Sequence, residues 1–145
     1  MRLVVAGILA LTAIGCAART HDTPSKPPSP PSSAWTLDRQ PVPRTLEEAL
    51  VALQHGLGDG TIARLRTAEE DIAIRLVPTL GRWMQDHWGL ATDGALARYF
   101  QQLGLERPDD MAAVILTSLW RELHFREIRL DEQIAWYRAT RERQP

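Results

Sequence analysis

Residues 108–123, PDDMAAVILTSLWREL, form the most apolar helical segment of the chain. Pro108 suits the first turn of a helix, and Asp109 and Asp110 bring negative charge to the end where it favours the helix dipole. Apolar side chains then recur on nearly every face of this helix: Met111, Ala112, Val114, Ile115, Leu116, Leu119, Trp120 and Leu123. A helix that is apolar on most of its surface is buried. We therefore expect this segment to be the central helix of the fold.

The segments before it also have helical periodicity. Thr45 and Glu48 have the spacing of a capping box, and Leu46, Ala49, Leu50, Leu53 and Leu57 follow at helical spacing. The glycines of GLGDG (56–60) should end this first helix. Further helical segments are expected over 61–66, 80–88 and 93–103. Another is expected to begin at Thr67, where the capping-box spacing recurs. Within them Pro78 should produce a kink or a new helix start, and Gly89 should end the helix before it.

The last predicted helix starts with Asp131 as its N-cap and runs to Arg141. Residues 125–130 (FREIRL) resemble a short strand, but no segment alternates over a longer stretch. The sequence therefore predicts an all-α fold, a compact bundle of about five or six short helices over residues 43–143.

The first sixteen residues are typical of an export signal. Arg2 is followed by the uncharged run 3–14, which is too short for a bilayer-spanning helix. The run ends in Ile14-Gly15-Cys16, which resembles the lipobox of bacterial lipoproteins. The resemblance implies that residues 1–15 are cleaved and that Cys16 is acylated and held in membrane lipid. With Ala17 rather than Asp after the cysteine, it also implies export to the outer membrane, facing the periplasm of a Gram-negative cell.

Residues 16–42 are expected to be a disordered tether. TPSKPPSPPSSA (23–34) contains five prolines and four serines, without apolar periodicity. Such a stretch favours extended polyproline II conformation and acts as a semi-rigid spacer. Trp35, at its end, is a candidate for docking on the folded part.

The composition excludes several functional classes. The 17 basic and 18 acidic residues give a net charge of −1, so no nucleic-acid partner is expected. The single cysteine cannot form an internal disulfide, and no two histidines have the helical spacing of a metal site. Ser118, the only serine of the helical region, lacks the glycines of a nucleophile elbow. We expect no metal and no cofactor, and the residues favour a non-catalytic protein over an enzyme.

Several motifs resemble those of a family of small bacterial domains of unknown function. They are the TLEEA sequence from Thr45, the LGRW and HWGL sequences that begin at Leu80 and His87, and the RPDDM sequence from Arg107. The resemblance covers about a hundred residues and implies a compact helical domain. It implies no activity.

The tryptophan motif gives the only functional indication. Trp83 and Trp88 belong either to the core or to a half-exposed aromatic surface, and arginine beside exposed aromatic residues is typical of protein-binding hot spots. Asp109 and Asp110 fit helix capping better than acid–base catalysis, since adjacent carboxylates on a helix diverge. The predicted partner-binding surface combines the two motif regions: Arg82, Trp83, Asp86, His87, Trp88, Arg107, Asp109 and Asp110.

Three functional hypotheses follow from these observations. The first is a membrane-tethered, non-catalytic domain that binds an envelope protein or polymer. The second is a periplasmic immunity-type protein that occludes a toxin. The third is an enzyme, which would need a cleft with convergent polar groups.

Overall fold

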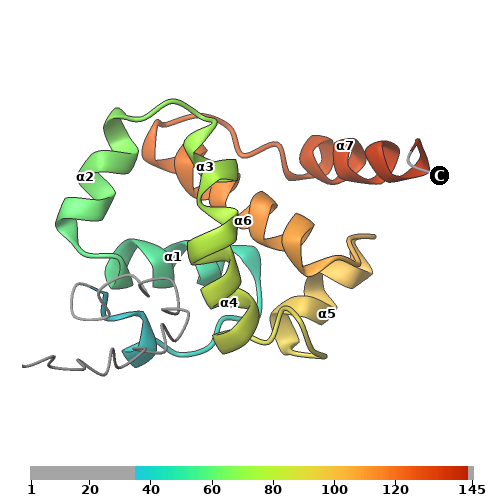
Figure 1. The fold of residues 1–145 in the computed structure, drawn as a ribbon, viewed down its shortest axis with the longest axis horizontal. Helices are drawn as coiled ribbons and strands as arrows, with labels where there is room; N and C mark the ends of the chain where they lie inside the picture. Colours follow the sequence, from blue (N-terminus) through green and yellow to red (C-terminus); the bar gives the residue numbers. More distant parts are fainter. Residues whose placement is uncertain (1–34, 144–145) are drawn as a thin grey trace, which may run out of the picture.

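The computed structural model describes residues 35–143, and within this range every regular element is helical (Figure 1). The predicted all-α fold is therefore confirmed. No helix among these residues has the length and hydropathy to cross a membrane. The predicted cleavage site and Cys16 lie outside the described residues. The elements are η1 (Leu37–Arg39), α1 (Leu46–Gly56), α2 (Asp59–Thr67), α3 (Ile72–Arg75), η2 (Val77–Gly81), α4 (Arg82–His87), α5 (Ala95–Gln102), α6 (Pro108–Leu123) and α7 (Leu130–Glu142).

Helix α6 is the centre of the fold, as its sequence predicts. It contacts α1, α2, α3, η2, α4, α5 and α7, and Figure 1 shows it passing through the middle of the molecule. Its buried side chains lie on nearly every face. Asp109 and Asp110 lie in its first turn, as expected. The other helices are therefore arranged around a single apolar rod.

Helix α1 begins with the predicted cap in a modified form. The Thr45 hydroxyl accepts a hydrogen bond from the Glu48 amide at 3.3 Å. The Glu48 carboxylate accepts from the amide of Arg44 at 2.7 Å, one residue before the amide used in a standard capping box. Two free amides at the helix start are still satisfied.

The helix start predicted at Thr67 is wrong. Thr67 is the last residue of α2, and its hydroxyl donates to the carbonyl oxygens of Ala63 and Arg64. The next helix, α3, begins only at Ile72. A threonine near a helix end satisfies carbonyl groups as readily as amides, so the TxxE spacing did not distinguish an end from a start.

The interruption predicted at Pro78, a kink or a new helix start, is confirmed as a new helical turn. Val77–Gly81 form a π-helical turn with the proline in its first positions, where the missing amide proton breaks no helical hydrogen bond. The turn joins α3 to α4. Helix α4 ends at His87, and Gly89, the predicted stop, follows its C-cap with a φ of +69°, the left-handed conformation that glycine adopts without strain.

The packed part of the chain begins earlier than the boundary predicted at residue 43. Leu37 is buried in the core, and Trp35 is half-buried against the same cluster, as anticipated for Trp35. The Thr36 amide donates to the carbonyl of Gly56 at 2.8 Å. A Cβ atom on Gly56 would lie 2.9 Å from Cγ of Leu37, so only glycine leaves room for this leucine. Residues 35–42 therefore belong to the domain rather than to the tether.

The start of α7 also differs from the prediction. The helix begins at Leu130, after Arg129 in left-handed conformation, so Asp131 lies in its first turn and is not the N-cap. Of the segment 125–130, residues 125–129 form a connecting loop and residue 130 begins α7, instead of the strand that the pattern resembles. In this loop Phe125 also has a positive φ, of 54°.

Truncation of Leu116 tests the central position of α6. This side chain is 2% exposed, and Leu116→Ala removes buried methyl groups and leaves a cavity. We expect the free energy of unfolding to fall by about 2 to 5 kcal/mol in denaturant titrations. Val51→Ala, on the exposed face of α1, is the control and should change it by less than about 0.5 kcal/mol. Equal effects of the two substitutions would contradict the assignment.

Candidate functional site

The tryptophan motif divides between core and surface. Trp88 is buried and meets the half-buried Trp83 edge to face, with ring centroids 5.6 Å apart. His87 stacks on the other side of Trp83 at 4.4 Å, and its Nδ1 lies 2.9 Å from the Trp83 carbonyl oxygen. These rings face a shallow pocket that also includes Leu37 and Val42. Trp88 and Trp83 therefore close the core beside η1, and His87 lies exposed outside them.

Two polar residues of the predicted surface, Arg82 and Asp109, line a different pocket. Arg82 and Asp86 form an exposed ion pair at 3.7 Å. Gln85, which is buried, donates to the Asp109 carboxylate at 2.7 Å and so links α4 to the start of α6. Arg82, Gln85 and Asp109 border a pocket of about 520 Å³ with Val77 and Pro78. Asp109 is therefore engaged by Gln85, whereas among the described residues Arg82 makes only the exposed ion pair.

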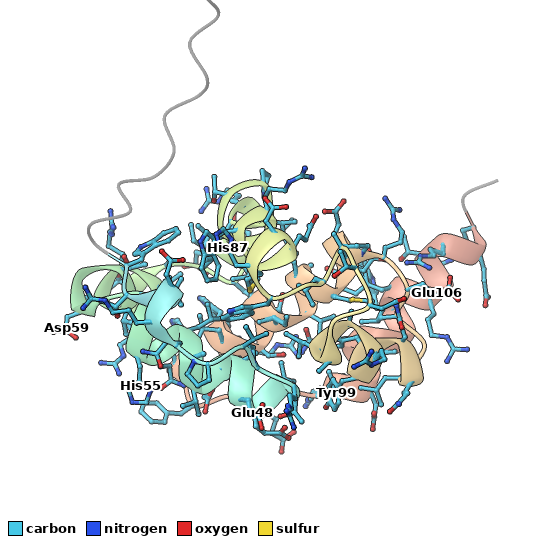
Figure 2. All side chains as sticks on the ribbon, turned by 90° about the horizontal axis from the view of Figure 1, so that it is seen from below. Glu48, His55, Asp59, His87, Tyr99 and Glu106 are labelled. Carbon is cyan, nitrogen blue, oxygen red and sulfur yellow. The ribbon has the colours of Figure 1, made fainter. Side chains whose placement is uncertain are left out.

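Asp110 points in a different direction from Asp109, as expected for adjacent helical carboxylates. Its carboxylate pairs with Arg141 of α7 at 2.7 Å, and Arg141 also lies 3.7 Å from Glu106. Arg107, between these residues, is exposed. Figure 2 shows Glu106 well apart from His87. The eight predicted residues include a buried ring, Trp88, and two carboxylates that bond to different helices, Asp109 to α4 and Asp110 to α7.

A groove between α3 and α7, with α6 as its floor, was not predicted. It measures about 390 Å³ and is lined mainly by apolar atoms. On its two walls stand Ile74 of α3, 52% exposed, and Trp136 of α7, 60% exposed. The Trp136 ring meets Tyr137 edge to face at 4.7 Å, which restrains its orientation. Large apolar side chains left in water in this way are typical of binding surfaces.

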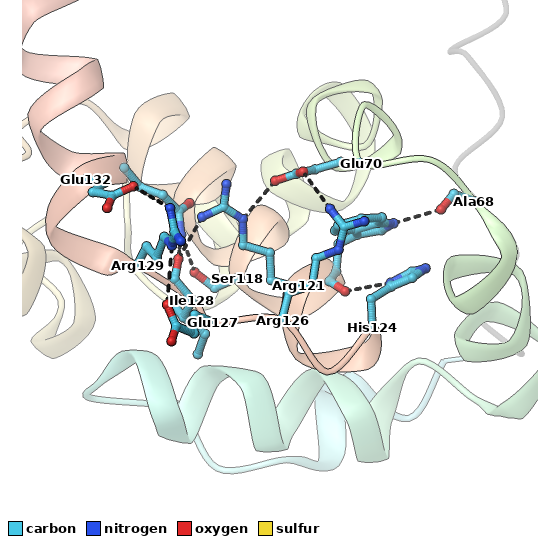
Figure 3. Close-up of polar contacts among 12 residues, drawn as sticks. Ala68, Glu70, Ser118, Arg121, His124, Arg126, Glu127, Ile128, Arg129 and Glu132 are labelled. Atoms are coloured by element: carbon cyan, nitrogen blue, oxygen red, sulfur yellow. Dashed lines mark hydrogen bonds and ion pairs between the residues drawn. The ribbon is translucent and has the colours of Figure 1, made fainter.

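An ion pair separates this groove from a neighbouring pocket. The Glu70 carboxylate accepts from Nε of Arg121 at 2.8 Å and lies 3.9 Å from the Arg126 guanidinium (Figure 3). Glu70 and Arg121 line both depressions, so the two adjoin at this ion pair. The pocket next to the groove measures about 400 Å³ and is otherwise lined by Arg126, Glu127 and Arg129 of the α6–α7 loop.

The α6–α7 loop holds a strained and exposed aromatic residue. Phe125 is 100% exposed, and both it and Arg129 have left-handed backbone conformations that non-glycine residues seldom adopt. The next residue, Arg126, has its guanidinium carbon 5.0 Å from the centroid of the Trp120 ring. Nε1 of Trp120 donates a hydrogen bond to the Ala68 carbonyl, which holds the ring. Such strain persists only where the surroundings impose it, and it concentrates at functional sites.

Gln133, at the base of the groove, holds an unsatisfied acceptor that is buried. Its side chain is 8% exposed, and its Nε2 donates to the Ile128 carbonyl at 2.7 Å and to the Ser118 hydroxyl at 3.2 Å. The contact with a carbonyl fixes the orientation of the amide, because the opposite assignment would place two oxygens together. Oε1 then has no donor among the described residues. Burying a hydrogen-bond acceptor without a donor costs free energy.

Sequence reasoning missed the groove because its walls come from distant segments. Glu70 and Arg121, for example, are 51 positions apart. The exposed position of Trp136 within α7 was the one local signal. Among the described residues, no group of three or more His, Asp or Glu side chains is arranged to hold a metal ion.

The chain matches a family model over residues 42–123, more than half of its length. The family is described as Domain of unknown function (DUF6794), and the chain belongs to it. The match ends with the last residue of α6, so the α6–α7 loop and α7 lie beyond it. Comparison with curated proteins and with solved structures gave no match.

Both tyrosines should titrate above pH 10. Burial raises the pKa of Tyr137 above its ordinary value of 10.0, and the Asp110 carboxylate raises it further. Burial and then Glu47 do the same for Tyr99. Because the folded pKa values exceed the unfolded ones, this contribution to stability is complete below pH 10 and is lost as pH rises through the folded values. Phenolate absorbance during an alkaline titration measures the shift, with the chain in denaturant as the reference. Identical curves would contradict it.

Proposed function

We propose that this protein is a lipid-anchored envelope protein whose helical domain binds a partner through the groove between α3 and α7. Acylated Cys16 holds the chain in the membrane, with the outer membrane favoured by Ala17. The Pro/Ser-rich segment up to residue 34 gives the domain reach from the bilayer. The groove carries the specificity.

The observation that carries the binding role is the exposure of Ile74 and Trp136 on facing walls of one depression. Their apolar surface is unfavourable in water and becomes favourable when a partner covers it. Phe125 adds a fully exposed ring on the loop beside the adjoining pocket. Aromatic anchors with arginine nearby dominate binding energy at many protein interfaces.

The groove fits a binding role better than the surface predicted from the tryptophan motif. There, Trp88 is buried, Asp109 is bonded to Gln85, and Asp110 is bonded to Arg141. A partner at that surface would have to compete with contacts that hold the helices together. At the groove, Ile74 and Trp136 are already exposed, so a partner can contact them without breaking contacts between helices.

The anchor is tested by Cys16→Ser. We expect the unchanged protein to fractionate with membranes and to begin at an acylated Cys16 in intact-mass measurements. The serine variant should lose acylation, because serine lacks the thiol that receives the lipid. A wild-type protein recovered without acyl groups and with residues 1–15 still attached would contradict the anchor.

The binding role is tested by placing a photo-crosslinking amino acid at position 136 in cells, with position 51 as the control. Val51 is equally exposed but lies on α1, away from the groove. We expect a discrete crosslinked species from position 136 that is absent from position 51 and is lost with Ile74→Arg, which replaces the apolar side chain of the facing wall with a bulky, positively charged one. Crosslinks that are alike at the two positions would contradict a role for the groove. A toxin as the crosslinked partner would identify the protein as immunity-type.

A further inference from the structure

We propose that the groove between α3 and α7 recognises a basic peptide segment of a partner protein, with an arginine or lysine side chain against Trp136. The inference rests on the proposed binding role of this groove and specifies the chemistry of its occupant. It draws on the charge of the lining, on its hydrogen-bonding capacity and on the exposed ring.

The charged lining of the groove is predominantly acidic. Glu70, Asp71 and Glu132 contribute three carboxylates, against the single guanidinium of Arg121. Arg121 is already paired with Glu70. The other two carboxylates have only exposed partners at 3.4 Å, Arg75 for Asp71 and Arg129 for Glu132. Exposed pairs of this kind contribute little, so an incoming cation can displace them.

The groove also offers more acceptors than donors. Ionised carboxylates only accept hydrogen bonds, and three of them, Glu70, Asp71 and Glu132, line the groove. Arginine, with five N–H donors and no acceptor, matches this lining better than any other side chain. An anionic occupant would be repelled by the same carboxylates.

The Trp136 ring provides a surface for the cation. Cations bind over the face of a tryptophan ring, and the edge-to-face contact with Tyr137 holds this ring in place. The same domain already uses this interaction where Arg126 lies over Trp120. Ile74, on the facing wall, can cover the methylene groups of a long basic side chain or an apolar neighbour.

The test uses two synthetic peptides that differ only in charge, acetyl-Leu-Arg-Leu-Arg-Leu-amide and acetyl-Leu-Glu-Leu-Glu-Leu-amide. Each is titrated into the full-length chain in detergent by isothermal titration calorimetry, with a detergent-only blank. We expect the basic peptide to bind at least about tenfold more tightly than the acidic one. Trp136→Ala and Glu132→Gln should each weaken its binding by about tenfold, as loss of a central contact does.

Two variants serve as matched controls. Glu142→Gln makes the same change of charge on the same helix, at an exposed residue outside the groove. Val51→Ala removes a comparably exposed apolar side chain from α1. Both should bind the basic peptide as the unchanged protein does. Circular dichroism spectra that match the unchanged protein would show that Trp136→Ala and Glu132→Gln remain folded.

Several results would overturn the proposal. They are tighter or equal binding of the acidic peptide, no binding of either peptide, equal loss of affinity in Glu142→Gln, or a dimer in solution that Trp136→Ala dissociates, which would assign the groove to a second copy of the chain. If the basic peptide fails while position 136 still gives its specific crosslink, only the proposed chemistry is wrong. If both fail, the binding role of the groove is wrong as well.

Discussion

Burial of α6 on nearly all of its faces is the constraint on which the rest of this structure depends. The sixteen residues of α6 carry apolar side chains around most of the helix surface, and neighbouring helices must cover that surface to keep it from water. The surrounding helices are short, and α3 is a single turn that would not form in isolation. They persist because each buries apolar surface against α6.

The polar residues at the ends of α6 then fix which neighbour lies where. At its start, Asp109 bonds to α4 through Gln85, and Asp110 bonds to α7 through Arg141. Near its end, Arg121 pairs with Glu70, just before α3. Apolar burial alone is not directional, so these bonds determine the positions of α3 and α7. The groove is the space that remains between two helices placed independently on the same rod.

Local signals in the sequence were enough for the elements whose ends are set by their own residues. Pro108 marked the start of α6, Pro78 the start of a new helical turn, and Gly89 the stop after α4. The prediction at Thr67 failed because a hydroxyl serves either end of a helix. Leu37 was missed because a single apolar residue among polar ones has no periodicity, and its burial depends on the absence of a side chain on Gly56.

The groove was beyond prediction for a different reason. Its walls are defined by where α3 and α7 settle on α6, and no short window of sequence contains both. Of the predicted surface, the sequence correctly indicated that Asp109 and Asp110 diverge. It could not indicate that both carboxylates are engaged by other helices, since those partners, Gln85 and Arg141, lie 24 and 31 positions away.

The left-handed backbone of Phe125 makes this residue an obvious target for stabilising the domain. Glycine would adopt the same backbone conformation without strain and would remove a ring that is wholly in water. Selection for heat resistance or solubility alone would therefore favour replacing Phe125, and a polar residue in place of Trp136. An engineering campaign guided only by melting temperature would improve the fold while erasing the features that distinguish this face of the molecule.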